Sequence, residues 1–173
     1  MLKMFTTQLN GLFQRIADKE GDSIEDGARL LAQAIVGEGH IYIQGFGEMK
    51  AVEAEALAGA EPFTRCQRLD TADTLTASDR VLLVSRFAHD SEALAAASIL
   101  QEKDIPFVAA AGLVQTEEDA LDALADVFID TKLIKGLLPD ETGGRTGFPS
   151  SLAALYIYFL LKLTIDEILR DQD

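Results

Sequence analysis

Residues 41–50 read Ile-Tyr-Ile-Gln-Gly-Phe-Gly-Glu-Met-Lys, and this stretch decides the fold. Its β-favouring residues lead into a Gly-x-Gly turn, and an alanine-rich helical pattern follows. A strand, a tight turn and a helix in this order form the first half of a βαβ unit. A backbone that turns so sharply presents N–H groups at the start of a helix, where anions are favoured.

The same alternation continues along the chain. Further strands are predicted over residues 63–69, 80–85, 107–111 and 127–129, with helices over 49–58 and 92–103. Strands that alternate with helices imply a parallel sheet, right-handed crossovers and helices on both faces. We therefore expect an α/β fold of three layers, α/β/α, with a five-stranded parallel sheet of the flavodoxin/Rossmann type. A single domain is expected to span residues 1–173.

Helical extensions are predicted at both ends. Residues 3–19 carry a helical stripe that Gly21-Asp22-Ser23 should break, and Ser23 should cap a second helix running to Ile35. An acidic stretch from Thr116 to Ala125 has helical character. Residues 139–149 are predicted to be a loop before a final helix over 150–170. Residues 152–161 of that helix are apolar nearly all round, so we expect cover from the N-terminal helices and from a second subunit, in a homodimer or homotetramer.

Composition limits the possible partners. The formal net charge is −14, which argues against nucleic acid and anionic membranes. The one cysteine, Cys66, excludes an intrachain disulfide and a cysteine-based zinc site, and we expect its thiol to be buried and inert. No secretory signal is visible, and the longest apolar run is too short to span a bilayer. We expect a cytoplasmic protein with no cofactor, and we predict no metal site.

The topology places the ligand site. In doubly wound sheets ligands bind beyond the carboxyl ends of the strands. That rule brings together the loops over residues 45–50, 86–91 and 112–115. An anion seat at this rim requires that the protein's own side chains leave it open.

The order of elements resembles the SIS (sugar isomerase) domain, and most closely its small phosphoheptose isomerase type. The resemblance lies in residues 41–47, residues 81–86 and the step through Ile105-Pro106 into residues 107–109. The first stretch is similar to the family's strand ending in Gly-x-Gly-x-Ser, and the second to its strand ending in Ser-x-Ser-Gly-x-Thr. The resemblance implies a phosphorylated sugar or another small anion as ligand, held by hydroxyls and backbone N–H groups.

This chain departs from the family pattern at several positions. Glu48 or Met49 stands where the first motif has serine, and Phe87-Ala88 replaces Ser-Gly in the second. The hydroxyl that opens the following helix is Ser91 with a slip of one residue, or it is missing. No histidine follows His89, although the phosphoheptose isomerase type has a histidine acid near its C-terminal helix.

The residues of the first two loops are open to two interpretations. Gly45 and Gly47 make room for a phosphate or simply form the strand-to-helix turn. Glu48 is either a general base or an acid favoured by the helix dipole. Ser85, Arg86 and Ser91 are candidate ligands, with Asp90 or Ser91 as the alternative helix cap; this list also includes His89, as acid/base or as a solvated loop residue.

Other charged residues have weaker assignments. Arg145, with Thr146 in the glycine-rich loop, either closes over an anionic ligand or pairs with Asp140 or Glu141. Lys132 and Lys135 are expected to be solvated. Nucleotide binding through the same glycine loop, with Asp70 on the ribose, is an alternative ligand class.

On the resemblance, the function would be to bind a phosphorylated sugar and to isomerise it between aldose and ketose. The N–H groups of Gly47 and Glu48, with the hydroxyls of Ser85 and Ser91, would hold the phosphate. Glu48 or His89 would move the proton. The alternative is a non-catalytic binding or scaffold protein that kept the fold but lost the catalytic groups.

Overall fold

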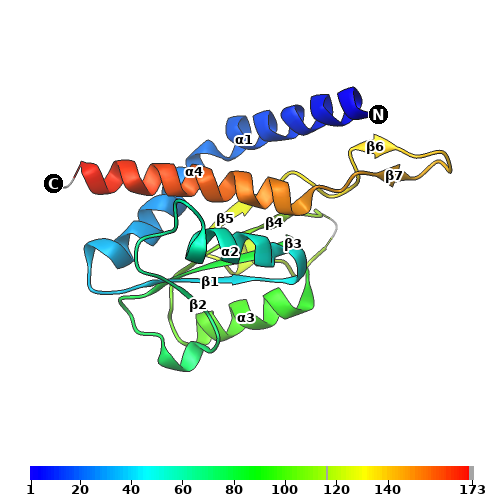
Figure 1. Ribbon diagram of the computed structural model, residues 1–173. Coiled ribbons are helices and arrows are strands. Elements are labelled where there is room, and N and C mark those ends of the chain that lie inside the picture. Colours follow the sequence, from blue (N-terminus) through cyan, green and yellow to red (C-terminus); the bar gives the residue numbers. More distant parts are fainter. Residues whose placement is uncertain (116, 172–173) are drawn as a thin grey trace.

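The computed structural model describes residues 1–115 and 117–171 (Figure 1). The elements and their bounds are α1 (Leu2–Val36), β1 (Ile41–Gly45), η1 (Gly47–Met49), α2 (Lys50–Ala58), β2 (Cys66–Arg68), η2 (Ala72–Thr74), β3 (Arg80–Phe87), α3 (Ser91–Glu102), β4 (Phe107–Gly112), η3 (Leu121–Ala123), β5 (Val127–Asp130), β6 (Leu138–Pro139), β7 (Arg145–Thr146) and α4 (Ser150–Arg170).

The main sheet has the strand order β2-β1-β3-β4-β5, and every neighbouring pair is parallel. The chain moves from β1 outward to β2 and then returns to place β3 on the other side of β1. This reversal makes the gap between β1 and β3 the topological switch point of the sheet. The expected three-layer α/β/α architecture is confirmed.

Each strand buries alternate side chains on opposite faces of the sheet. Leu82 and Val84 of β3 pack in the larger cluster with α1, α2 and α4. Val81 and Leu83 pack in the other cluster, to which α3 contributes Ala93, Ala97 and Leu100. Figure 1 shows α3 alone below the sheet and the other three helices above it.

The N-terminal region is one continuous helix, so the prediction of two helices separated at residues 21–23 is wrong. Gly21 and Ser23 are strong local signals for a break, but packing along α1 overrides them. Leu12, Ile16, Ala28 and Leu31 are fully buried. A continuous helix keeps these four side chains in one core.

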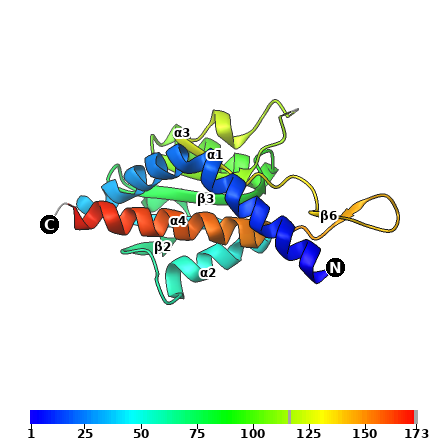
Figure 2. The same cartoon turned by 90° about the horizontal axis from the view of Figure 1, so that it is seen from above.

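The C-terminal helix α4 lies where the sequence predicted it, whereas the preceding loop contains a short antiparallel hairpin, β6–β7. Figure 2 shows α1 crossing over α4, with the first turns of α1 near the hairpin. The ring of Phe5 lies so close to Gly147 that a Cβ atom on this glycine would be 3.2 Å from it. The start of the chain therefore rests on the segment that leads into α4.

The acidic stretch between β4 and β5 forms only the short 3-10 turn η3. Thr116, where helical character was predicted to begin, lies outside the described residues. Ala120 precedes η3 with an extended backbone. The predicted helical character is thus limited to one turn.

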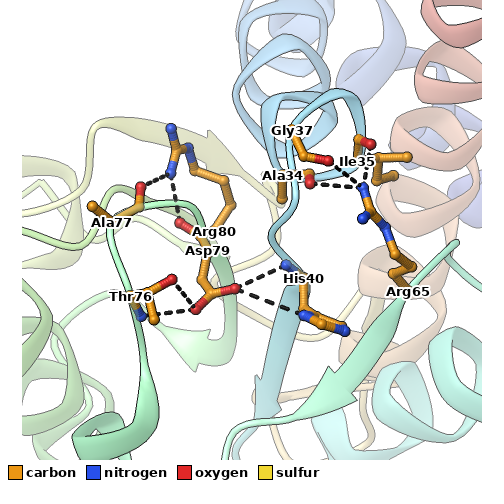
Figure 3. Close-up of polar contacts among 9 residues, drawn as sticks. All are labelled: Ala34, Ile35, Gly37, His40, Arg65, Thr76, Ala77, Asp79 and Arg80. Carbon is orange, nitrogen blue, oxygen red and sulfur yellow. Dashed lines mark hydrogen bonds and ion pairs between the residues drawn. The ribbon is translucent and has the colours of Figure 1, made fainter.

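Polar contacts secure the amino-terminal edge of the sheet (Figure 3). The guanidinium of Arg65 donates to the carbonyl groups of Ala34, Ile35 and Gly37, and so caps the end of α1, whose last turn has no basic residue. The carboxylate of Asp79 accepts from the backbone N–H groups of His40 and Thr76. These contacts join α1, β1 and β3 at the edge opposite the predicted site.

Candidate functional site

An ion pair joins the two loops that flank the switch point. The guanidinium of Arg86, in β3, donates from Nε to Oε1 of Glu48 at 2.7 Å and from Nη2 to Oε2 at 2.8 Å. Two parallel bonds of this kind are the strongest geometry for an arginine and a carboxylate. The structure therefore brings together Glu48 and Arg86, which were predicted separately as base and ligand.

The start of α4 adds a residue that was predicted only as a cap. Ser150 Oγ donates to Oε1 of Glu48 at 2.6 Å, and it makes no capping bond to its own helix. The Glu48 carboxylate thus lies between a guanidinium, a hydroxyl and a helix N-terminus. These three groups are what an anionic ligand would seek.

An open groove of about 520 Å³ lies beside this ion pair. Its lining residues are Glu48, Arg86, Phe87, Phe148, Ser150 and Ser151. The rings of Phe87 and Phe148 meet edge to face, with centroids 5.8 Å apart. The groove therefore has apolar aromatic side chains next to a polar set of two hydroxyls and a paired arginine.

The ion pair changes the acidity of Glu48. The hydrogen bond from Arg86 lowers the pKa of this carboxyl to about 2, with a smaller contribution from Ser150; partial burial acts in the opposite direction. Glu48 is therefore ionised at neutral pH. It is also a weak base for as long as Arg86 holds it.

Ser85, predicted to bind phosphate, faces its own loop. Its side chain is fully buried, and its hydroxyl lies 2.8 Å from both the carbonyl oxygen of Phe87 and Oδ2 of Asp90. The same Asp90 oxygen accepts the backbone N–H of Phe87. Asp90 is in the N-cap position of α3, as predicted, but its side chain stabilises the β3–α3 loop and makes no cap bond.

His89 and Ser91 lie on the same loop but do not line the groove. The His89 ring stacks on Phe87 with centroids 5.4 Å apart. Its Nδ1 atom is buried and finds no hydrogen-bond partner among the described residues. Ser91 is the first residue of α3 and is exposed.

The two glycines have different roles in the backbone. Gly45 is required for a close approach, because a Cβ atom there would be 2.2 Å from the carbonyl oxygen of Met49. Its N–H donates to Oε1 of the buried Glu53 at 2.8 Å. Gly47 has φ +57°, the left-handed conformation that glycine adopts most readily, and is exposed.

Arg145 and Thr146 lie in the β6–β7 hairpin, which projects past the start of α4 (Figure 1). The Arg145 guanidinium donates to the carbonyl oxygens of Gly136 and Leu137, and neither Arg145 nor Thr146 lines the groove. Asp140 instead accepts from backbone groups of its own turn.

At the far end of the rim, Lys132 is paired, contrary to the expectation that it would be solvated. Its Nζ lies 2.6 Å from Oε1 of Glu20 and 3.1 Å from Oδ2 of Asp130. The other Glu20 oxygen accepts the backbone N–H of Asp130. This contact ties α1 to the end of β5.

The described residues contain neither a metal-binding cluster nor a membrane-spanning helix. No group of three or more histidine, cysteine, aspartate or glutamate side chains within them has an arrangement suited to a metal ion. Among the helices of residues 1–115 and 117–171, none combines the length and the apolar character that a membrane crossing needs.

Comparison with known sequences assigns the family. Residues 1–169 match the family described as Domain of unknown function (DUF2529), so the chain belongs to it. The protein YwjG of Bacillus subtilis (strain 168), described as uncharacterized, is 44% identical over 172 residues, which are 99% of each chain.

Comparison with solved structures identifies the fold as that of SIS-domain proteins, as the resemblance implied. E. coli CFT073 c3406, solved in complex with a phosphosugar, aligns with a TM-score of 0.75 at 15% identity, over 98% of this chain and 89% of that one. Vibrio vulnificus NanR complexed with ManNAc-6P gives 0.70 at 15%, over 98% and 62%. Phosphoheptose isomerase GmhA from Neisseria gonorrhoeae gives 0.66 at 15%, over 95% and 94%.

Proposed function

We propose that this member of the DUF2529 family binds a phosphorylated sugar in the groove at the switch point. The observation that carries the proposal is the position of the groove. It lies beyond the carboxyl ends of β1 and β3 and is lined by one guanidinium, two serine hydroxyls and two aromatic rings. Its volume of about 520 Å³ is within the usual range for sites of small ligands.

The lining residues divide by chemistry. Arg86, Ser150 and Ser151 are suited to a phosphate, because they offer a planar pair of donors and two hydroxyls at the start of α4. Phe87 and Phe148 offer apolar surface to the C–H face of a sugar ring. The carboxylate of Glu48 is an acceptor for sugar hydroxyls.

Structural neighbours support this ligand class. Two of them were solved with phosphosugars, one of which is ManNAc-6P, and a third neighbour is a phosphoheptose isomerase. This chain differs from the expected motifs in its phosphate ligands, since Ser85 is bonded within its own loop. The arginine and the α4 serines take that role in our proposal.

Aldose–ketose isomerisation is a second candidate, favoured by the carboxylate of Glu48 in the groove. In this reaction the Glu48 carboxylate would take the proton from C2 of an open-chain aldose as the C1 carbonyl becomes an enediol. The proton would then return to C1. A phosphate that takes over Arg86 would remove the main cause of the low Glu48 pKa and so make Glu48 a better base.

Binding is tested by thermal shift and calorimetry with pentose, hexose and heptose phosphates, the matching free sugars, and nucleotides. We expect only sugar phosphates to raise the melting temperature. Arg86→Gln should abolish this shift, whereas Arg29→Gln, which removes the same charge from a surface pair on α1, should retain it. A shift that survives Arg86→Gln, or no shift with any sugar phosphate, contradicts the proposal.

Catalysis is tested separately, by exchange of the C2 hydrogen of bound sugar phosphates with deuterated solvent. Exchange that is lost in Glu48→Gln supports isomerisation. Binding without exchange supports the non-catalytic alternative.

A further inference from the structure

We propose that Glu48 is an internal competitor for the ligand's phosphate, so that the phosphate enters only by displacing the Glu48 carboxylate from Arg86 and Ser150. This inference rests on the proposed function, because it concerns how the same groove is opened.

The contacts of Glu48 are those of a bound anion. Both carboxylate oxygens accept from Arg86, and Oε1 also accepts from Ser150. Within the described residues of the groove, Arg86 is the sole positively charged lining residue, and Glu48 neutralises it. A phosphate therefore meets an arginine whose donors toward the groove are already in use.

Displacement is compatible with the surroundings of Glu48. The carboxylate is not deeply enclosed, since 30% of the side chain is exposed, as is 51% of that of Arg86. Gly47, the preceding residue, has no atom within 4 Å of the position of its missing Cβ. Glu48 lies in the three-residue turn η1, which is not part of a long helix. The acid can therefore leave its partners without unpacking the core.

Electrostatics make this competition strong. A carboxylate and a phosphate cannot share one guanidinium and one hydroxyl at contact distance without like-charge repulsion. The chain's net charge of −14 adds a general repulsion of anions. Removing the charge of Glu48 should thus both free Arg86 and relieve the repulsion.

The test compares Glu48→Gln with the wild type by calorimetric titration of inorganic phosphate and glucose 6-phosphate. We expect Glu48→Gln to bind phosphate at least tenfold more tightly, a gain of about 1.4 kcal/mol. Glu38→Gln is the matched control, because it removes one negative charge from an exposed residue outside the groove. Ser150→Ala combined with Glu48→Gln should lose most of the gain.

The outcomes separate this inference from the proposed function. If the wild type binds glucose 6-phosphate and Glu48→Gln binds it equally or more weakly, the inference is wrong and the proposed function stands. An equal gain in Glu38→Gln also overturns the inference, because net charge would then be the cause. If neither ligand binds to any variant, both are wrong. Glu48→Ala, checked by circular dichroism, replaces Glu48→Gln if the latter does not fold.

Discussion

The hydroxyl of Ser85 lies 2.8 Å from Oδ2 of Asp90, five residues further along the chain. This contact closes the loop between β3 and α3 on itself and points the serine away from the groove. A serine at this position is a ligand in the motif that the chain resembles. Here it stabilises the loop that carries Arg86 to its place.

Ser85→Ala should therefore lower stability while leaving ligand affinity unchanged. Loss of a hydrogen bond to a charged group, with the partner left partly buried, should cost about 1–3 kcal/mol. Chemical denaturation measures the free energy of unfolding. Ser91→Ala is the comparison, because Ser91 is exposed and should change stability by less than about 0.5 kcal/mol. A phosphosugar affinity that falls tenfold in Ser85→Ala at unchanged stability would contradict this role.

The two glycines of the first loop should respond differently to alanine. Gly45→Ala places a Cβ atom against the Met49 carbonyl, so we expect a loss of about 3 kcal/mol or a misfolded protein. Gly47→Ala meets no neighbouring atom and carries only the cost of a left-handed conformation, about 1–2 kcal/mol. Thermal and urea unfolding of the two variants give the comparison. Equal losses would show that the close approach at Gly45 is not what limits substitution.

Acid should weaken the contact between β1 and β3. Because the pKa of Glu48 is lowered from 4.5 to about 2 in the folded protein, its stabilising contribution is complete above about pH 4.5. It is lost as the pH falls from there toward 2. Glu48→Gln should therefore flatten the stability curve within this window and not above it. Carboxyl-carbon NMR of Glu48 measures the pKa directly, and a value near 4.5 in the wild type would contradict the ion pair.

Lys132 should be worth more to stability than a surface lysine. Replacement by methionine leaves Glu20, which is almost fully buried, without its cation, at an expected cost of about 2–3 kcal/mol. Lys135→Met, on the same segment, is the matched control. Hydrogen bonds from Lys132 to Glu20 and Asp130 raise the lysine pKa despite its partial burial, so this contribution is present at neutral pH and is lost at strongly alkaline pH. A double-mutant cycle with Glu20→Gln isolates the pair.

The thiol of Cys66 should be unreactive in the native protein. Burial raises the pKa of this thiol to about 12, so the thiolate is scarce at neutral pH. Labelling with a disulfide reagent should be slow in buffer and fast in urea. Rapid native labelling would show that the end of β2 opens.

The sequence indicated the sheet well because its strands are short apolar runs between clear turns. Residues 81–84 lie in β3 and residues 107–111 in β4, and the location of the site follows from topology alone. The helix break at Gly21 was wrong because a local signal does not report burial of residues on both sides of it. Element boundaries thus depend on packing that only the folded chain supplies.

The composition of the site was harder to predict. Glu48 and Arg86 were identified as candidates, but their pairing depends on the facing ends of two strands 38 positions apart in sequence. Ser150 is 102 positions from Glu48, and its hydroxyl is indistinguishable in sequence from an ordinary helix cap. Arg145 looked suitable for a mobile clamp because its loop is rich in glycine. Its guanidinium is instead held by the carbonyl groups of Gly136 and Leu137.

The contact between Phe5 and Gly147 connects the start of the chain to the groove. The next residue, Phe148, is one of the groove's aromatic side chains, and Ser150 follows two positions later. A force applied to the opening turns of α1 is thus transmitted through a single peptide link to the ligand's seat. Truncation of those turns would be felt as altered affinity before it was felt as unfolding.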